Sequence, residues 1–226
     1  MAVKKKASRK HSNYDKNFVE LTPRNVNQNE YIKQLLDFRQ FIVFGIGPAG
    51  TGKTLLAVKA AIKAFKDRKV DKIIITRPAV ETDEKLGHLP GTLEEKMDPF
   101  TRPIFDVFKE HFSNQEIQSM INESVIEISP LAYMRGRTFK NSYIIADEMQ
   151  NATANQMKML LTRLGENSNM VVTGDLAQAD RSNDNGLIDF IKRLNKYPST
   201  CLSIIQFDTY DIERHEAVAE VLRIYD

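Results

Sequence analysis

Residues 41–54 read FIVFGIGPAGTGKT, and this stretch decides the fold. Its first six residues are apolar apart from one glycine, which is the pattern of a strand buried on both faces. The last eight match G-x-x-x-x-G-K-[ST] in full, and an Ala- and Lys-rich helical pattern follows over residues 53–66. A strand, a glycine-rich loop and a helix in this order predict a phosphate-binding loop.

The residues of this loop have separate expected roles. Glycines let consecutive backbone N–H groups turn toward phosphate oxygens without a Cβ in the way, and the helix behind the loop adds the positive end of its dipole. Lys53 is expected to reach the β- and γ-phosphates and to act in catalysis, and the hydroxyl of Thr54 to bind Mg²⁺. The residues expected to bind the nucleotide are Gly47, Pro48, Ala49, Gly50, Thr51, Gly52, Lys53 and Thr54.

A second motif is the run YIIADE at residues 143–148, an apolar strand that ends in two acids. Asp147 is expected to hold Mg²⁺ through its water shell, and Glu148 to polarise the attacking water as the catalytic base. A strand followed by two acids is common by itself. Its combination with a complete phosphate loop predicts an enzyme that hydrolyses a nucleotide.

A third polar cluster ends the run VVTGDLAQ at residues 171–178. The carboxyl ends of parallel strands share one edge of a sheet, where ligands bind. Thr173, Asp175 or Gln178 could therefore sense the γ-phosphate. The alternative is an ordinary turn built from Gly and Asp.

The rest of the chain alternates short apolar runs with helical patterns. Further apolar runs lie at residues 72–76, 124–129, 143–147, 170–174 and 202–207, and helical patterns at 29–38, 93–112, 153–164, 186–195 and 212–223. Pro99 and Pro103 are expected to break or kink the helix at 93–112. This alternation predicts one α/β domain over residues 26–226, with a mostly parallel sheet and helices on both faces.

Composition limits the remaining possibilities. The chain has 226 residues, of which 42% are hydrophobic and 27% charged, with a net charge of +2, as in an ordinary soluble protein. Residues 1–25 are predicted to form a flexible basic arm, which either contacts nucleic acid or only aids solubility. Cys201, the one cysteine, is expected to be a buried structural thiol in a cytoplasmic protein. No apolar stretch is long enough to predict a membrane span.

Taken together, the motifs resemble those of the PhoH-like ATPases, a family similar to the first motor domain of superfamily-one helicases. The matching segments are GIGPAGTGKT (45–54), ITRPAV (75–80), EKLGHLPG (84–91), RGRTF (135–139), ADEMQN (146–151) and TGDLAQ (173–178). The resemblance covers residues 28–221 and implies a RecA-like P-loop NTPase domain. Glu216 stands where the family often has proline, a departure that leaves Arg214 untouched.

The resemblance also implies residue roles. Gln28 is similar to the glutamine with which such motors read the adenine edge, which implies ATP as the nucleotide. Arg77 stands where these motors contact nucleotide or nucleic acid. The segment from Arg135 to Arg137 and the pair Arg214-His215 are the two candidate sources of an arginine finger. Arg137 and Arg214 are the residues expected to act in catalysis, and His215 is expected to be structural. The chain offers room for one motor domain, so we expect a neighbouring subunit, in a hexameric ring, to complete the site.

Three functions compete on this evidence. The first is ATP hydrolysis coupled to the binding or remodelling of RNA or single-stranded nucleic acid, as in a helicase, although the sequence lacks an aromatic-rich basic stretch. The second is a nucleotide kinase, which the position of Glu148 disfavours. The third is an ATP-gated assembly or regulatory protein in which hydrolysis only times ring formation.

Overall fold

A parallel sheet organises the structure, a computed structural model that describes residues 18–78, 93–178, 185–197 and 199–213 together with residues 217, 218, 220 and 224. Its strands are β1 (Ile42–Ile46), β2 (Lys72–Thr76), β3 (Ile126–Ile128), β4 (Ser142–Ala146), β5 (Asn169–Gly174) and β6 (Leu202–Gln206). They lie in the order β3-β2-β4-β5-β1-β6, and every pair of neighbours is parallel. Each predicted apolar run overlaps one strand, and the predicted α/β class is confirmed.

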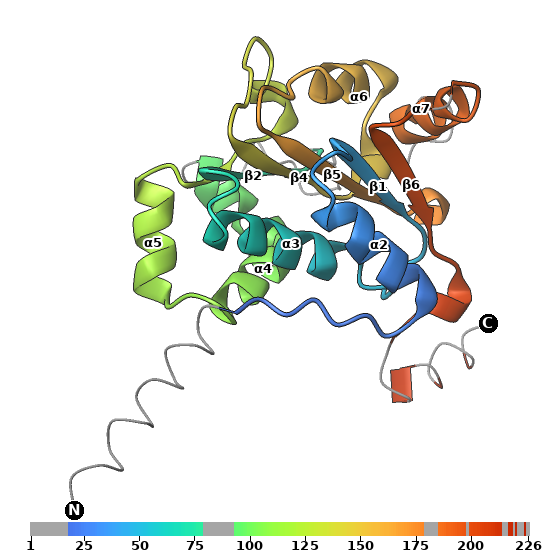
Figure 1. Ribbon diagram of the computed structural model, residues 1–226, viewed down its shortest axis with the longest axis horizontal. Coiled ribbons are helices and arrows are strands. Elements are labelled where there is room, and N and C mark those ends of the chain that lie inside the picture. Colours follow the sequence, from blue (N-terminus) through green and yellow to red (C-terminus); the bar gives the residue numbers. More distant parts are fainter. Residues whose placement is uncertain are drawn as a thin grey trace, which may run out of the picture.

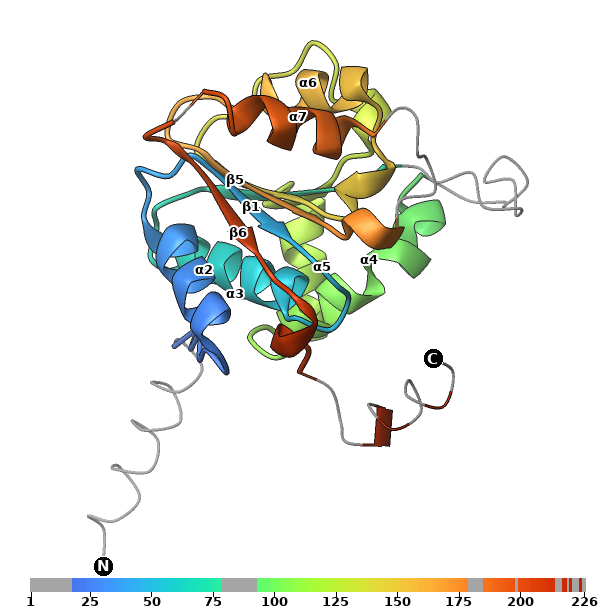
Figure 2. The ribbon, with the colours of Figure 1, turned by 90° about the vertical axis from the view of Figure 1, so that its right-hand side faces the viewer.

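Helices cover both faces of this sheet, as Figures 1 and 2 show. One face carries α2 (Val26–Leu36), α3 (Lys53–Lys66) and α4 (Leu93–Lys109), and the other carries α6 (Ala154–Leu161) and α7 (Gly186–Leu194). Side chains alternate between the two faces of a strand. Ile73 and Ile75 accordingly pack in the core beneath α3, whereas Ile74 packs in the core beneath α6 and α7.

Helix α5 (Asn114–Asn122), which lies next to β3, was not predicted. It is short, and its apolar residues are too few for a clear helical period. It begins with a capping box in which Ser113 accepts from the N–H of Glu116 and the Glu116 carboxylate accepts from the N–H of Ser113. The spacing S-x-x-E is a start signal that the sequence does contain.

The prediction that prolines interrupt the helix at 93–112 is wrong, because α4 continues through Pro99 and Pro103 to Lys109. A proline inside a helix costs about 3 kcal/mol. Ile104, Val107 and Phe108 are buried after the second proline. Burying such side chains contributes about 1.5–3 kcal/mol each, so packing outweighs the lost hydrogen bond.

Two further expectations need correction. Val19 is buried and Leu21 packs against the core, so residues 18–25 belong to the domain rather than to a flexible arm. Figure 1 shows this segment crossing below α3 before it enters α2. Residues 1–17 lie outside the described residues. Cys201 is half-buried rather than buried, because it precedes β6 at the edge of the sheet. Among the described residues, no helix is long and apolar enough to cross a membrane.

Candidate active site

The loops that follow β1, β4 and β5 meet at one edge of the sheet. Strand β5 lies between β1 and β4, with Gly45 beside Thr173 and Ala146 beside Val172. Because the strands are parallel, their carboxyl ends share this edge. The phosphate loop and Asp147 are thereby brought together although 93 residues separate Thr54 from Asp147.

The backbone of the phosphate loop requires glycine at two positions. Gly47 has φ of 146°, and a Cβ on it would lie 2.3 Å from the carbonyl oxygen of Phe207. Gly52 has φ of 82° and precedes α3 directly. The first hydrogen bond of that helix runs from the N–H of Leu56 to the carbonyl of Gly52 (2.9 Å). The N–H groups of residues 53–55 therefore lie ahead of the helical ladder, which is the arrangement that binds anions.

Lys53 lies inside this loop and is only 8% exposed. Its ammonium group donates to the carbonyls of Gly47 (2.7 Å) and Pro48 (2.6 Å) and to the hydroxyl of Thr51 (3.2 Å). Burial lowers the pKa of Lys53, and three nearby carboxylates oppose that shift: Asp175, Glu148 and Asp147. A cation held among carbonyls and facing acids is placed to bind a phosphate.

Asp147 connects the phosphate loop to β5. One of its carboxylate oxygens, Oδ1, accepts from the hydroxyl of Thr54 (2.7 Å) and from the hydroxyl of Thr173. Mg²⁺ prefers oxygen ligands and keeps several of its waters, so a hydroxyl and a carboxylate in contact fit that ion. The described residues contain no group of three or more acidic, His or Cys side chains that could hold a metal without a substrate.

Glu148 begins the short helix η3 (Met149–Asn151) in a left-handed conformation, with φ of 55°. Such a backbone costs about 1–3 kcal/mol in a residue other than glycine and is concentrated at functional sites. The side-chain amide of Gln150 donates to the Glu148 carboxylate, and its oxygen accepts from the N–H of Asp175 (3.2 Å). Gln150 thus holds Glu148 to the turn after β5.

Gln150 received no role from the sequence, although it lies in the matching segment ADEMQN. It is buried, and its carbonyl accepts from the side chain of Asn185 (2.9 Å) at the start of α7. The one feature of the sequence that could have identified Gln150 is that it is a polar residue two positions after the acidic pair. Its partners, however, come from other parts of the chain and could not be seen in the sequence.

Gln28 lies against the phosphate loop. Its amide nitrogen donates to the carbonyl of Thr51 (3.1 Å), and its oxygen accepts from the N–H of Arg24 (2.9 Å). These two bonds fix which end of the amide faces the loop. Each amide end keeps further capacity to bond, because the nitrogen carries two hydrogens and the oxygen two lone pairs.

The segment from residue 209 to residue 213 packs against the phosphate loop, a contact that the sequence did not predict. The side chain of Asn27 donates to the carboxylate of Asp211 (2.8 Å), in the short helix η5 (Thr209–Asp211). Two residues later, the N–H of Glu213 donates to the carbonyl of Gly50 (3.0 Å). The start of α2, the phosphate loop and η5 therefore pack together.

Among the described residues, Arg137 lies at another part of the sheet, whereas Arg77 follows a strand residue that contacts Asp147. Arg137 donates to Glu127 on β3 (2.9 Å) and lies over the ring of Phe139, and β2 separates β3 from β4. Gln178 is exposed in the short helix η4 (Leu176–Gln178). Arg77 follows Thr76, whose carbonyl accepts from the N–H of Asp147 (2.9 Å). Arg214 and His215 lie outside the described residues.

Comparison with known proteins gives consistent matches. A family model described as "PhoH-like protein" matches residues 20–226. The chain is 46% identical over 203 residues to the PhoH-like protein of Bacillus subtilis (strain 168), covering 89% of this chain and 62% of that protein. It is 44% identical over 210 residues to the PhoH-like protein of Mycobacterium tuberculosis (strain ATCC 25618 / H37Rv), covering 91% and 58%. It is 40% identical over 206 residues to protein PhoH of Escherichia coli (strain K12), covering 89% and 57%.

The chain thus spans about three fifths of the length of the curated relatives that it matches. Among solved structures it is similar to the helicase domain of Pyrococcus furiosus Hef, with a TM-score of 0.48 and 13% identity. That similarity covers 84% of this chain and 39% of the other.

Proposed function

The chain belongs to the PhoH-like protein family, and on that premise we propose that it binds ATP with Mg²⁺, hydrolyses it, and couples hydrolysis to RNA or single-stranded nucleic acid. The observation that carries this proposal is the link from Thr54 through Asp147 to Thr173, beside the buried ammonium of Lys53. This link joins the phosphate loop to two further strands, as an enzyme that acts on bound phosphates needs.

Each residue of the site then has a chemical task. The phosphate oxygens of ATP replace the loop carbonyls as acceptors for Lys53, whose ammonium stabilises their negative charge. Thr54 and Asp147 hold Mg²⁺, which when bound neutralises charge on the phosphates. Glu148 takes a proton from the attacking water, and Gln150 fixes the carboxylate in position. Gln28 donates to and accepts from the adenine edge. We also assign the protein to the cytoplasm, because its lone cysteine fits a reducing compartment.

We further propose that the site is completed between subunits of a hexameric ring. The Arg137 guanidinium belongs to the β3 end of the sheet and is 42% exposed, a position suited to act on a neighbour rather than on its own phosphate loop. Arg214 is the second candidate. An inactive Lys53→Ala subunit mixed with an inactive Arg137→Ala or Arg214→Ala subunit should regain part of the ATPase activity. If both mixtures assemble and remain inactive, the shared site is excluded.

The test of the proposed function is ATP hydrolysis, measured as phosphate release with and without RNA, single-stranded DNA and duplex DNA at low salt. We expect Mg²⁺-dependent release that a single-stranded polymer stimulates. Release without stimulation by any polymer would instead favour the ATP-gated assembly protein, in which case size-exclusion chromatography should show oligomers that depend on ATP and Mg²⁺. If no phosphate is released under any condition, the proposal is contradicted. If the phosphoryl group is instead transferred to a nucleotide acceptor, the protein is a kinase.

A further inference from the structure

The loop between β3 and β4 presents two side chains outward from a fixed base. Leu131, Met134 and Phe139 anchor this loop and are buried. Between these anchors, Tyr133 is 62% exposed at the end of the short helix η2 (Leu131–Tyr133), and Arg135 is exposed two residues further on. The anchors hold an aromatic ring and a guanidinium group at the surface without a hydrophobic partner that would hide the ring.

A hollow of about 500 Å³ lies between this loop and α6. Figures 1 and 2 show the loop beside α6 at one end of the molecule, across the sheet from α2 and α3. A hollow of that size holds a group as large as a nucleobase. It is lined by Leu131, Ala132, Arg135, Asn155, Gln156 and Met159, which provide apolar contact, amide groups and a cation, but no acid.

The two segments that form this surface carry charge of one sign. Residues 129–141 and 153–164 together contain five cations and no acid. Arg137 pairs with Glu127, and Lys140 pairs with Glu166. Within the described part of the chain, the other three have no carboxylate partner: Arg135, Lys158 and Arg163.

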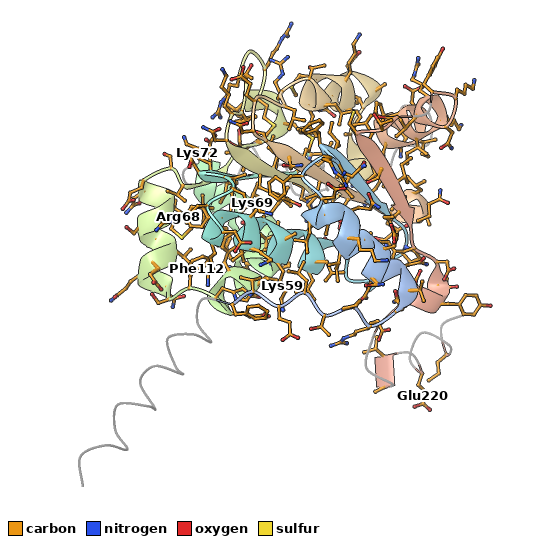
Figure 3. All side chains as sticks on the ribbon, viewed as in Figure 1. Lys59, Arg68, Lys69, Lys72, Phe112 and Glu220 are labelled. Carbon is orange, nitrogen blue, oxygen red and sulfur yellow. The ribbon has the colours of Figure 1, made fainter. Side chains whose placement is uncertain are left out.

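The opposite face differs in this respect. Figure 3 labels Lys59 and Lys69 on that side of the molecule. Lys59 pairs with Glu110 and Lys63 with Asp67, while the ammonium of Lys69 lies 4.5 Å from the ring centre of Phe38. Those cations already have partners in the chain. Compared with these three lysines, Arg135 and Lys158 are better placed to bind an external anion.

A second hollow, of about 440 Å³, lies between α6 and α7. Asn155 lines both hollows, and Lys158 lines the second. The two hollows are thus on either side of the first turns of α6. A ligand that fills both must be long and must cross the helix, which suits a polymer rather than a small molecule.

We propose that this η2–α6 surface, made of Tyr133, Arg135, Asn155 and Lys158, binds a single strand of nucleic acid. An unpaired base stacks on the guanidinium plane of Arg135 in the first hollow, or on the exposed ring of Tyr133, which follows the lining residue Ala132. Arg135 and Lys158 contact the phosphates on either side. The ligand class rests on the proposed function. The surface is also close to Glu148 along the chain, because α6 begins six residues after Glu148 and its N-terminal cap, Thr153, follows η3.

The experiment measures fluorescence anisotropy of labelled oligo(U) and oligo(dT), each about 12 nucleotides long and within the usual range of single-strand sites. Tyr133→Ala and Arg135→Ala should each weaken binding about 5- to 100-fold, the range found when a stacking residue is removed. Tyr133→Phe keeps the ring and should bind like the wild type. Matched controls outside both hollows, Phe18→Ala, which removes an aromatic ring that is 64% exposed, and Lys33→Ala, should change affinity less than about twofold. Comparing the two oligonucleotides separates RNA from DNA as the source of the strand.

The outcomes separate this surface from the proposed function. If the wild type binds an oligonucleotide and both alanine variants bind equally well, the surface is wrong and the nucleic-acid role stands. If the wild type binds neither, the nucleic-acid role fails and the surface with it. If the variants lose basal ATPase activity and no longer elute as oligomers in size-exclusion chromatography, the surface contacts another copy of the chain instead. Loss of binding with basal ATPase activity and oligomeric state retained supports the proposal.

Discussion

The phosphate site and the η2–α6 surface hold their polar side chains in opposite ways. In the phosphate site, Lys53, Asp147 and Thr173 are buried, and each bonds to another group of the chain. On the surface, Tyr133 and Arg135 are exposed, and no hydrogen bond to either side chain is found among the described residues. One region is organised before a ligand arrives, whereas the other provides contacts that form only with a ligand.

This difference predicts how each region responds to substitution. Removing one member of a buried network leaves its partners without a bond, which costs more than the bond itself contributed. Removing an exposed side chain leaves nothing unsatisfied and subtracts only its own contact. We therefore expect non-additive losses of catalysis in the phosphate site and additive, salt-dependent losses of nucleic-acid affinity on the η2–α6 surface.

Lys53→Ala should have the largest effect. It removes the ammonium group inside the loop and with it the attraction of that group for three carboxylates (Asp147, Glu148 and Asp175). We expect kcat/KM for ATP to fall at least about 10³-fold, beyond the 10²–10³ typical for removing one neutral donor from a charge-stabilising site. Steady-state phosphate release measures this. Lys63→Ala, on the same helix but paired at the surface with Asp67, is the control and should retain activity.

Glu148→Gln should have the next largest effect, confined to the chemical step. The substitution keeps the size of the side chain but removes the base, so we expect kcat to fall about 10²–10³-fold, within the range for general-base catalysis. ATP affinity, measured by calorimetry, should stay near that of the wild type. A variant that keeps full kcat would show that another group activates the water. Glu110→Gln, which weakens only the contact with Lys59, is the matched control.

Gln150→Leu tests whether the network acts as a unit. Leucine fills a similar volume but leaves the Glu148 carboxylate and the N–H of Asp175 without their partner. We expect kcat to fall about 10- to 50-fold, as for a buried polar group left unsatisfied at about 1–3 kcal/mol.

A control and a readout distinguish this effect from general damage. Gln34→Leu also removes a hydrogen bond between glutamine and glutamate (2.8 Å), but on the surface of α2. It should leave kcat unchanged. The double variant Glu148→Gln, Gln150→Leu should be no slower than Glu148→Gln alone, because Gln150 acts through Glu148. Equal, independent losses in the double variant would contradict the positioning role.

The sequence predicted the phosphate site better than the η2–α6 surface, for a physical reason. The loop from Gly47 to Thr54 is contiguous, and its chemistry depends on local backbone geometry, so a local pattern is enough. The strands were predicted because both faces of the sheet are covered, which makes each of them a continuous apolar run. The partners of Gln150 and the contact between Asn27 and Asp211 depend instead on strand order and on how loops pack, and no local pattern encodes either.

The η2–α6 surface shows the same limit more strongly. Tyr133 and Asn155 are 22 positions apart in the sequence and belong to different elements, so a search for an aromatic-rich basic stretch could not find them. Whether a tyrosine is exposed also depends on its neighbours in space. Tyr143 is buried and Tyr133 is not, although both lie in apolar stretches of sequence, and Tyr31 is buried although its neighbours in sequence are mostly polar.

Lys158→Ala should have the smallest effect and is the sharpest test of the exposed region. Lys158 lies on α6, and alanine favours a helix at least as well as lysine, so the fold should be unaffected. If its ammonium contacts one phosphate, oligo(U) affinity should fall only about two- to fivefold at low salt, and the slope of log affinity against log salt should decrease by about 0.7. The reason is that one fewer counterion is released on binding. Anisotropy titrations at several salt concentrations measure both quantities.

In Lys158→Ala combined with Tyr133→Ala, the two losses should add, because neither side chain depends on the other for its position. Lys33→Ala removes the same charge from the opposite face and should leave the slope unchanged. If the double variant loses much more affinity than the sum of the two single losses, the η2–α6 surface is an organised network like the phosphate site. If Lys33→Ala changes the salt slope as much as Lys158→Ala does, the η2–α6 surface is not the binding surface.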